Sequence, residues 1–135
     1  MANSLYTAAK KAFLDGGIAL LTADIKVVLV DSADYTRDLA AHDFLDDIPA
    51  GARVATSGNL TNKTTTGGVF DADDITITGV TGDQFEYIVL YKDTGVASTS
   101  NLIVCLDTAT GLACTPNGGD ITITWDSGPS KIFAL

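Results

Sequence analysis

The pentapeptide Asp-Ile-Thr-Ile-Thr occurs twice in the chain, at residues 74–78 and again at residues 120–124. In each copy isoleucines alternate with threonines, which places the isoleucines on one face of an extended strand and the threonines on the other. Such alternation is typical of a half-buried antiparallel strand. Each copy is followed by a Thr-Gly or Ser-Gly turn and then by an apolar run, so the sequence predicts two equivalent strand–turn–strand hairpins.

Other strand patterns surround the repeats. Residues 24–31 contain the apolar run Val-Val-Leu-Val, which predicts a strand at the centre of a sheet. Residues 84–92 predict a strand that is buried on both faces. Residues 52–57, 102–107 and 131–135 complete the set, and the apolar last strand is expected to be tied into the sheet. Short strands between glycine-rich turns predict a mainly β fold, either an antiparallel β-sandwich or a barrel-like sheet.

Two helices are expected beside the strands. Residues 3–15 predict an N-terminal helix, with Asn3 or Ser4 as its cap and Gly16-Gly17 as its stop. Its apolar stripe consists of Leu5, Ala8, Ala9, Ala12 and Phe13. The alanines suit close packing on the chain's own sheet or on a partner subunit. Residues 41–48 predict a second helix of only one or two turns, because a proline follows it.

The length and composition predict one β-rich domain over residues 1–135. A chain of this length buries a core without disulfides or metals, and 46% of its residues are hydrophobic. No stretch approaches the roughly 20 apolar residues that span a bilayer, and the N-terminus lacks the pattern of a secretory signal. The polar segment 58–68 fits an edge strand, a hairpin or a mobile loop.

The net charge of −9 argues against nucleic acid as a partner. Binding to phosphates needs clustered basic residues, and Lys10-Lys11 is the only adjacent basic pair. An acidic surface keeps a protein soluble, and it also steers the protein toward a basic partner.

The sequence predicts no catalytic, cofactor-binding or metal-binding residues. His42 is the only histidine, which rules out a histidine-based triad or a histidine-rich metal site within one chain. It lies in the acidic segment 38–47 and is expected to be a solvated surface residue. We find no nucleophile-elbow sequence and no Walker-type phosphate loop.

Asp71, Asp73 and Asp74 form the tightest group of carboxylates. Hard cations such as Ca²⁺ favour oxygen ligands, but the spacing lacks the glycine and the distal glutamate of an EF-hand loop. A solvated turn before a strand is the preferred interpretation, and the same holds for Asp46-Asp47.

Two cysteines lack the further cysteine or histidine partners of a zinc site. Cys105 lies in a predicted strand and Cys114 in the loop before Pro116. Free thiols are expected, because nothing in the sequence indicates an oxidising compartment. A disulfide across the short loop remains an alternative.

Several segments of the sequence, taken together, carry a resemblance to known proteins: NSLYTAAKKAFLDG, DIKVVLVDSADYT, FLDDIPAGARVATSGNLTNKT, EYIVLYKDTG, TPNGGDITITW and the terminal IFAL. Nearly end to end, they resemble a group of small structural proteins of tailed bacteriophages. The resemblance implies a non-enzymatic virion component, made in the host cytoplasm and working without a cofactor. Its expected partners are further copies of itself and other virion proteins, such as the major capsid protein or a tail or collar protein.

Three functional hypotheses follow. The resemblance favours a virion structural protein, with capsid decoration (cement) preferred over a collar, tail or fibre subunit. A carbohydrate- or receptor-binding module is the second hypothesis, in which Tyr6, Tyr35 or Trp125 would stack on a sugar if exposed. Packing in the core or at an interface is the default expectation for such residues. A hydrolytic enzyme is the third and least favoured hypothesis, because the lone histidine lacks plausible partners. Within the virion hypothesis, the N-terminal helix and segment 58–68 are expected to reach a neighbour.

Overall fold

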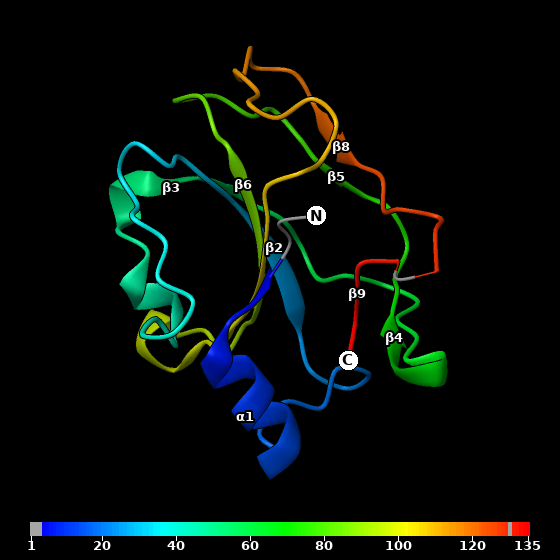
Figure 1. Cartoon of the computed structure of the whole chain (residues 1–135). Coiled ribbons are helices and arrows are strands. Elements are labelled where there is room, and N and C mark those ends of the chain that lie inside the picture. Colours follow the sequence, from blue (N-terminus) through cyan, green and yellow to red (C-terminus); the bar gives the residue numbers. More distant parts are fainter. Residues whose placement is uncertain (1–3, 130) are drawn as a thin grey trace.

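The computed structural model describes residues 4–129 and 131–135. Its largest unit is an antiparallel sheet of five strands in the order β1-β7-β6-β2-β3, shown in Figure 1. The strands are β1 (Ser4–Leu5), β2 (Ile25–Val30), β3 (Arg53–Thr56), β6 (Tyr87–Lys92) and β7 (Leu102–Leu106). The mainly β, antiparallel fold expected from the sequence is therefore confirmed.

The inner strands of this sheet carry much of the core. β2 pairs with β6 along its whole length, from Ile25 opposite Lys92 to Val30 opposite Tyr87. All five residues of β7 are buried, and so are four consecutive residues of β6. Strands that are buried on both faces need continuous apolar runs, which is the pattern that predicted them. The predictions of a central strand at 24–31 and a doubly buried strand at 84–92 are both confirmed.

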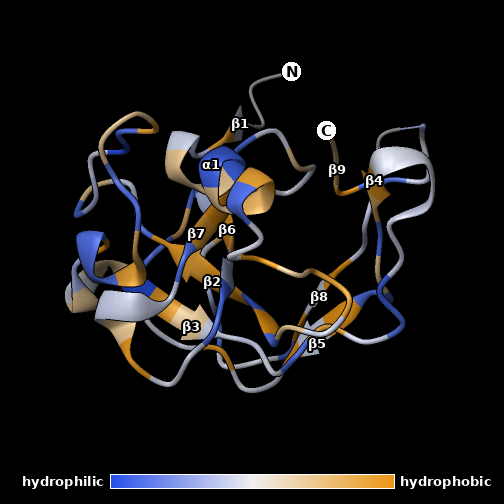
Figure 2. Cartoon of the chain, turned by 90° about the horizontal axis from the view of Figure 1, so that it is seen from below, coloured by the Kyte–Doolittle hydropathy of each residue, from blue (hydrophilic) through white to orange (hydrophobic). Residues whose placement is uncertain are grey.

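Two short ribbons lie on one side of the large sheet, as Figures 1 and 2 show. β5 (Ile75–Ile77) pairs with β8 (Ile121–Ile123), and β4 (Val69–Phe70) pairs with β9 (Phe133–Ala134). The buried side chains of both ribbons belong to the same apolar cluster as the large sheet. β9 ties the C-terminal segment into a ribbon, which confirms the expectation for residues 131–135.

The prediction of two equivalent hairpins is wrong. The two copies of the repeated pentapeptide pair with each other, with Thr76 opposite Thr122 at the centre of both. Alternation specifies which face of a strand is buried, but it does not specify the strand's partner. Here Ile77 and Ile123 both enter the common core, and the exposed hydroxyls of Thr76 and Thr122 share a hydrogen bond of 2.8 Å. The predicted faces are thus confirmed, while the predicted pairing is replaced.

Helix α1 (Thr7–Asp15) is shorter than the predicted helix 3–15. Ser4 and Leu5 pair with β7 instead, and the backbone N–H of Tyr6 donates to the carbonyl of Ile103 at 3.0 Å. Pairing with the sheet holds these residues in an extended conformation, so Ser4 does not cap the helix, and Asn3 lies outside the described residues. The predicted stop is confirmed, because Gly16 ends the helix with a φ of 80° that favours glycine.

The expected helix at 41–48 is a single 3₁₀ turn, Leu45–Asp47. Phe44 is extended and bridges to Asn101, while the N–H of Leu45 donates to the carbonyl of Ser100 at 2.9 Å. These contacts with the chain before β7 replace the helical hydrogen bonds that residues 41–44 would have made. Further 3₁₀ turns are Ala50–Ala52, Thr66–Gly68 and Ala97–Thr99.

Segment 58–68 forms neither an edge strand nor a hairpin of its own. Its regular structure comprises one isolated bridge between Thr64 and Asp71 and the Thr66–Gly68 turn. In the part of the chain that the structure describes, no helix is long and apolar enough to cross a membrane.

Candidate functional site

The three carboxylates singled out in the sequence act as local hydrogen-bond acceptors. Asp73 accepts hydrogen bonds from the side chains of Thr61 and Asn62, and an oxygen of Asp74 accepts the backbone N–H of Trp125 at 3.0 Å. Asp71 joins the bridge to segment 58–68 through its backbone. These groups fasten the loop and β8 to the start of β5, in line with their interpretation as a turn before a strand.

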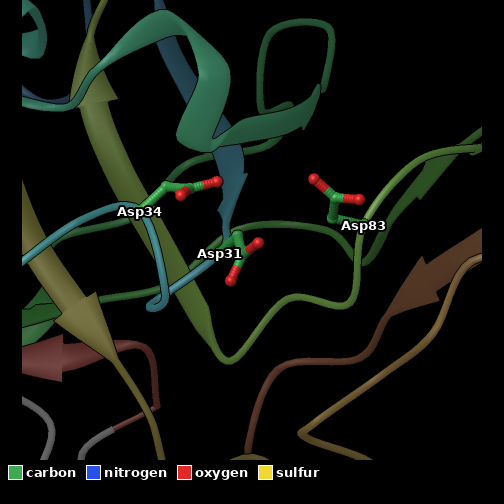
Figure 3. A group of neighbouring side chains, drawn as sticks. All are labelled: Asp31, Asp34 and Asp83. Atoms are coloured by element: carbon green, nitrogen blue, oxygen red, sulfur yellow. The ribbon is translucent and has the colours of Figure 1, made fainter.

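A different group of carboxylates converges in space. Asp31, Asp34 and Asp83 each offer an oxygen, and these oxygens lie within 4.8 Å of one another (Figure 3). Asp31 is buried at the end of β2 and accepts the N–H of Ala33 at 2.9 Å, whereas Asp34 and Asp83 are exposed. Such oxygens suit a hard cation, although Ca²⁺ takes six to eight ligands and water would supply the rest.

Sequence reasoning missed this cluster because Asp83 lies about 50 residues from Asp31. The β2–β6 register places Val30 opposite Tyr87, and this pairing brings the turn before β6 beside the end of β2. The sequence would have indicated this carboxylate cluster only if the β2–β6 register had been known.

His42 is not the solvated residue that the sequence predicts. It is half-buried, and its Nδ1 lies 2.8 Å from the Tyr35 hydroxyl and 3.3 Å from the backbone nitrogen of Asp38. A backbone N–H only donates, so Nδ1 accepts, and a neutral ring then carries its proton on Nε2. The Tyr35 hydroxyl in turn lies 2.9 Å from that of Tyr6, which extends the chain into the core.

The phenols of Tyr6 and Tyr35 remain neutral near physiological pH. Burial raises the pKa of Tyr35 to about 12, and burial raises the pKa of Tyr6 further. A phenol that holds its proton this firmly is a poor general base or nucleophile. The hydrogen-bonded series Tyr6–Tyr35–His42 therefore satisfies buried polar groups, and its two phenols supply no reactive group.

Cys105 and Cys114 are both free thiols, as the sequence predicts. Cys105 is buried in β7, where burial raises the pKa of its thiol. Arg37 lies 3.7 Å from its sulfur and 3.2 Å from a carboxylate oxygen of Asp107. The thiolate is the reactive form of cysteine, so a raised pKa makes Cys105 a weak nucleophile.

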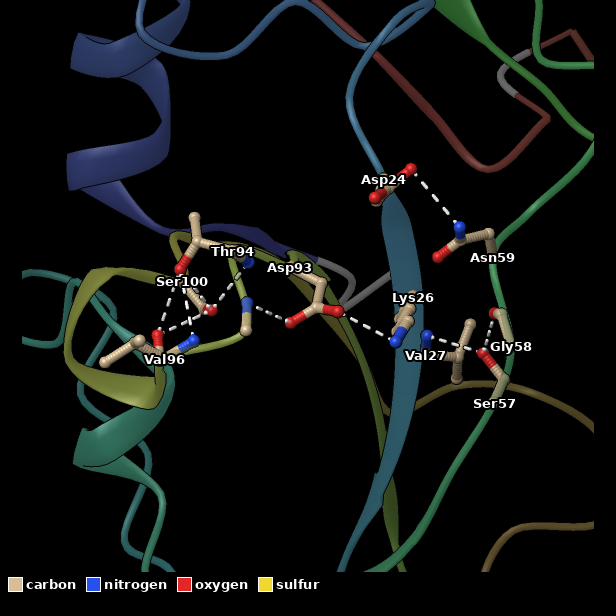
Figure 4. A network of polar contacts seen from close by, with 11 residues as sticks. Asp24, Lys26, Val27, Ser57, Gly58, Asn59, Asp93, Thr94, Val96 and Ser100 are labelled. Atoms are coloured by element: carbon tan, nitrogen blue, oxygen red, sulfur yellow. Dashed lines mark hydrogen bonds and ion pairs between the residues drawn. The ribbon is translucent and has the colours of Figure 1, made fainter.

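A polar network joins the ends of β2, β3 and β6 (Figure 4). Lys26 forms an ion pair with Asp93 at 2.7 Å, and Asp93 also accepts the N–H of Gly95 at 3.0 Å. The hydrogen bond from Lys26 lowers the pKa of Asp93, and the same bond raises the pKa of Lys26. The Ser57 hydroxyl accepts the N–H of Val27 at 2.8 Å, so this network braces strand ends.

The aromatic residues proposed for sugar stacking lie in the core. Tyr6 is 0%, Tyr35 2% and Trp125 9% exposed. The indole N–H of Trp125 donates to the carbonyl of Asp73 at 2.9 Å, which satisfies its one polar group. The default expectation of core packing is therefore confirmed for these three residues, and none of them offers the exposed ring that sugar stacking needs.

A groove of about 620 Å³ opens beside β8, and we call it the β8 groove. β8 and Trp125 contribute one part of its lining. The rest comes from the large sheet, the loop that follows β7 and the start of the C-terminal segment, including Phe85, Ile88, Leu106, Leu112, Lys131 and Ile132. This volume lies in the range of ligand pockets and peptide grooves, and the lining is mainly apolar.

Comparison with models of known protein families gives no match for this chain, and comparison with curated proteins gives none either.

Proposed function

We propose that this chain is a non-enzymatic structural protein of a tailed-bacteriophage particle, and specifically a capsid decoration (cement) protein. The observation that carries the proposal is the resemblance of its sequence phrases, nearly end to end, to small virion structural proteins. A decoration protein binds the shell by protein–protein contacts repeated through the symmetry of the particle. Its partners are the major capsid protein and further copies of itself.

The polar groups of the structure support a structural role. The histidine and the phenols bond to one another, and the buried thiol keeps its proton. The carboxylates of the 71–74 turn hold neighbouring segments in place. These groups are occupied by contacts that stabilise the fold.

Exposed apolar side chains on and near α1 support a contact surface there. Leu14 is 89% exposed in α1, Leu21 is 55% exposed shortly after it, and Leu135 is 68% exposed beyond β9. The rings of Phe13 and Phe133 lie 6.0 Å apart, which joins α1 to β9. Exposed apolar side chains mark protein contact sites when they gather on one face, and we propose that these leucines belong to one such surface.

A collar, tail or fibre subunit is the alternative within the same class. The carbohydrate-binding alternative loses its main support, because Tyr6, Tyr35 and Trp125 are buried.

Quantitative mass spectrometry of purified particles of the source phage tests the proposal. A copy number near that of the major shell protein is expected for decoration. A small, reproducible fraction would place the chain at the collar, tail or fibre. Absence from purified particles would contradict the virion role.

Rebinding to particles that lack the protein tests the contact surface. Deleting residues 1–15 would also remove the buried Tyr6, so a point variant is the sharper probe. Leu14→Ser is expected to reduce particle binding by about tenfold, because an exposed leucine that becomes buried at an interface contributes roughly 1.5–3 kcal/mol. Val96→Ser is the control, since Val96 has an exposed apolar side chain that belongs to the loop between β6 and β7 and not to α1. Equal binding by both variants would exclude α1 from the interface.

A further inference from the structure

The repeated pentapeptide pairs with itself in a register that is symmetric about its own centre. Thr76 faces Thr122, Ile75 faces Ile123 and Ile77 faces Ile121. Continued by one residue at each end, this register sets each aspartate opposite a threonine. The sequence Asp-Ile-Thr-Ile-Thr is thus shown, within this chain, to form an antiparallel ladder with an identical copy.

β8 has a partner along one edge only. β5 is its single neighbour in the ribbon, and no other backbone hydrogen bond of Ile121–Ile123 is found within the described part of the chain. Strands with a free edge are templates for pairing with another chain. Ile121 and Ile123 also line the β8 groove, so the strand borders a mainly apolar opening.

We propose that β8 pairs antiparallel with β8 of a second copy, with Thr122 of one copy opposite Thr122 of the other. The four strands then form a continuous sheet in the order β5-β8-β8-β5 around a two-fold axis. An isologous contact of this kind closes on itself and yields a dimer. Added main-chain hydrogen bonds supply affinity, and alternate side chains supply specificity.

In the proposed dimer, the isoleucines and threonines of the second β8 extend the isoleucine face and the threonine face of the β5–β8 ribbon. In the proposed register, Ile121 of one copy lies opposite Ile123 of the other, on the face that lines the β8 groove. Ile88, Leu106 and Leu112 of the same groove provide apolar surface for them. Ile121 is half-buried in the single chain, so covering the rest of its side chain contributes only part of the roughly 1.5–3 kcal/mol of full burial, before the cost of association. Ile123 is already buried in the single chain.

Charge favours the same register, although each chain carries a net charge of −9. Asp120 of one copy lies opposite Thr124 of the other, so no two carboxylates face each other across the new ladder. Like charges directly opposite would destabilise the pair. Lys131 and Asp126 both line the β8 groove, so one positive and one negative side chain lie beside the incoming strand.

Disulfide trapping tests the two-fold axis directly. In a Cys114→Ser background, Thr122→Cys places two thiols opposite each other across the axis. Directly opposed Cβ atoms lie about 4.5–5.5 Å apart, so a small adjustment allows a disulfide. Thr76→Cys is the matched control, because Thr76 has the same sequence context and the same exposed face but lies on β5.

Under mild oxidation we expect Thr122→Cys to form covalent dimer about tenfold faster than Thr76→Cys. Equal rates for the two variants would overturn the β8–β8 register.

Sedimentation equilibrium provides a second test that needs no covalent bond. The wild type is expected to be a concentration-dependent dimer. Thr122→Lys sets two lysines opposite each other and should weaken the dimer about tenfold, most strongly at low salt, whereas Thr76→Lys should change it by about twofold or less. A wild type that stays monomeric up to about 1 mM would overturn the proposal, and so would equal weakening by both variants. These experiments use purified protein, so their outcome is independent of whether the chain binds a phage particle.

Discussion

At the scale of single residues, the buried hydroxyl of Tyr35 connects two other polar groups. It lies within hydrogen-bond distance of Tyr6, which is fully buried, and of His42. A buried polar group that loses its partner is costly, because neither water nor protein satisfies it. Tyr35 therefore connects the hydrogen-bonded series Tyr6–Tyr35–His42.

Tyr35→Phe is expected to lower the free energy of unfolding by about 1–3 kcal/mol, because it leaves the Tyr6 hydroxyl without its partner. Urea denaturation monitored by circular dichroism measures the change. Tyr87→Phe is the control, since Tyr87 is half-buried and contacts Tyr35 through its ring. Equal losses in the two variants would show that the hydrogen-bonded chain contributes nothing specific.

A second residue-scale prediction concerns pH. Folding lowers the pKa of Asp93 through its bond to Lys26, so the ionised carboxylate favours the folded state. This contribution is present above the ordinary aspartate pKa of about 3.9, and it is lost as the pH falls through the lower folded value. Asp93→Asn should therefore cost about 1 kcal/mol at neutral pH and progressively less in acid.

Urea denaturation of wild type and Asp93→Asn across this pH range checks the prediction. Asp15→Asn serves as control, because Asp15 pairs with Lys11 on an exposed face of α1. A difference between wild type and Asp93→Asn that does not change with pH would contradict the assigned role.

At the scale of secondary-structure elements, β9 depends on its buried ring. β9 has a ladder of only two residue pairs with β4, but Phe133 packs against Phe70 and Phe13 with ring centroids 5.3 Å and 6.0 Å away. So short a ladder contributes little by itself, and the packing of the aromatic rings holds the strand.

Phe133→Ala is expected to destabilise the fold by about 3 kcal/mol, because it opens a cavity between α1 and the β4–β9 ribbon. Leu135→Ala in the same segment should change stability by about 0.5 kcal/mol or less, since Leu135 is exposed. Thermal unfolding of both variants tests the contrast. A small loss for Phe133→Ala would mean that the ribbon is held by its backbone alone.

At the scale of the whole molecule, the excess of acidic groups sets the response to salt. The chain carries 17 acidic and 8 basic residues, and the cluster of Asp31, Asp34 and Asp83 concentrates the repulsion. Self-repulsion destabilises a compact state, and salt screens it.

Raising the ionic strength from about 0.01 M to about 0.15 M should therefore raise the melting temperature by about 3 °C. Asp83→Asn should raise the melting temperature at low salt and reduce the salt effect, in a buffer free of divalent cations. Asp46→Asn, which removes the same charge from an exposed site elsewhere, should do less. A melting temperature lowered by Asp83→Asn would instead indicate that the cluster stabilises the fold.

Local patterns in the sequence were enough to predict every strand except β1 and β4, the faces of the repeated pentapeptide and the stop of α1 at Gly16. Alternation, continuous apolar runs and a glycine with positive φ act within a few residues, so they are legible without the fold. The start of α1 could not be predicted in this way. Ser4 and Leu5 have a helical pattern, but they pair with β7 and are extended.

Only the tertiary structure decided what each segment touches. It paired β5 with β8, placed Tyr6, Tyr35 and Trp125 in the core, gave His42 its partners and brought Asp83 beside Asp31. The physical reason is that burial and strand register are properties of contacts between residues far apart in the chain. A local pattern states that a face must be covered, and the packing of the whole chain determines what covers it.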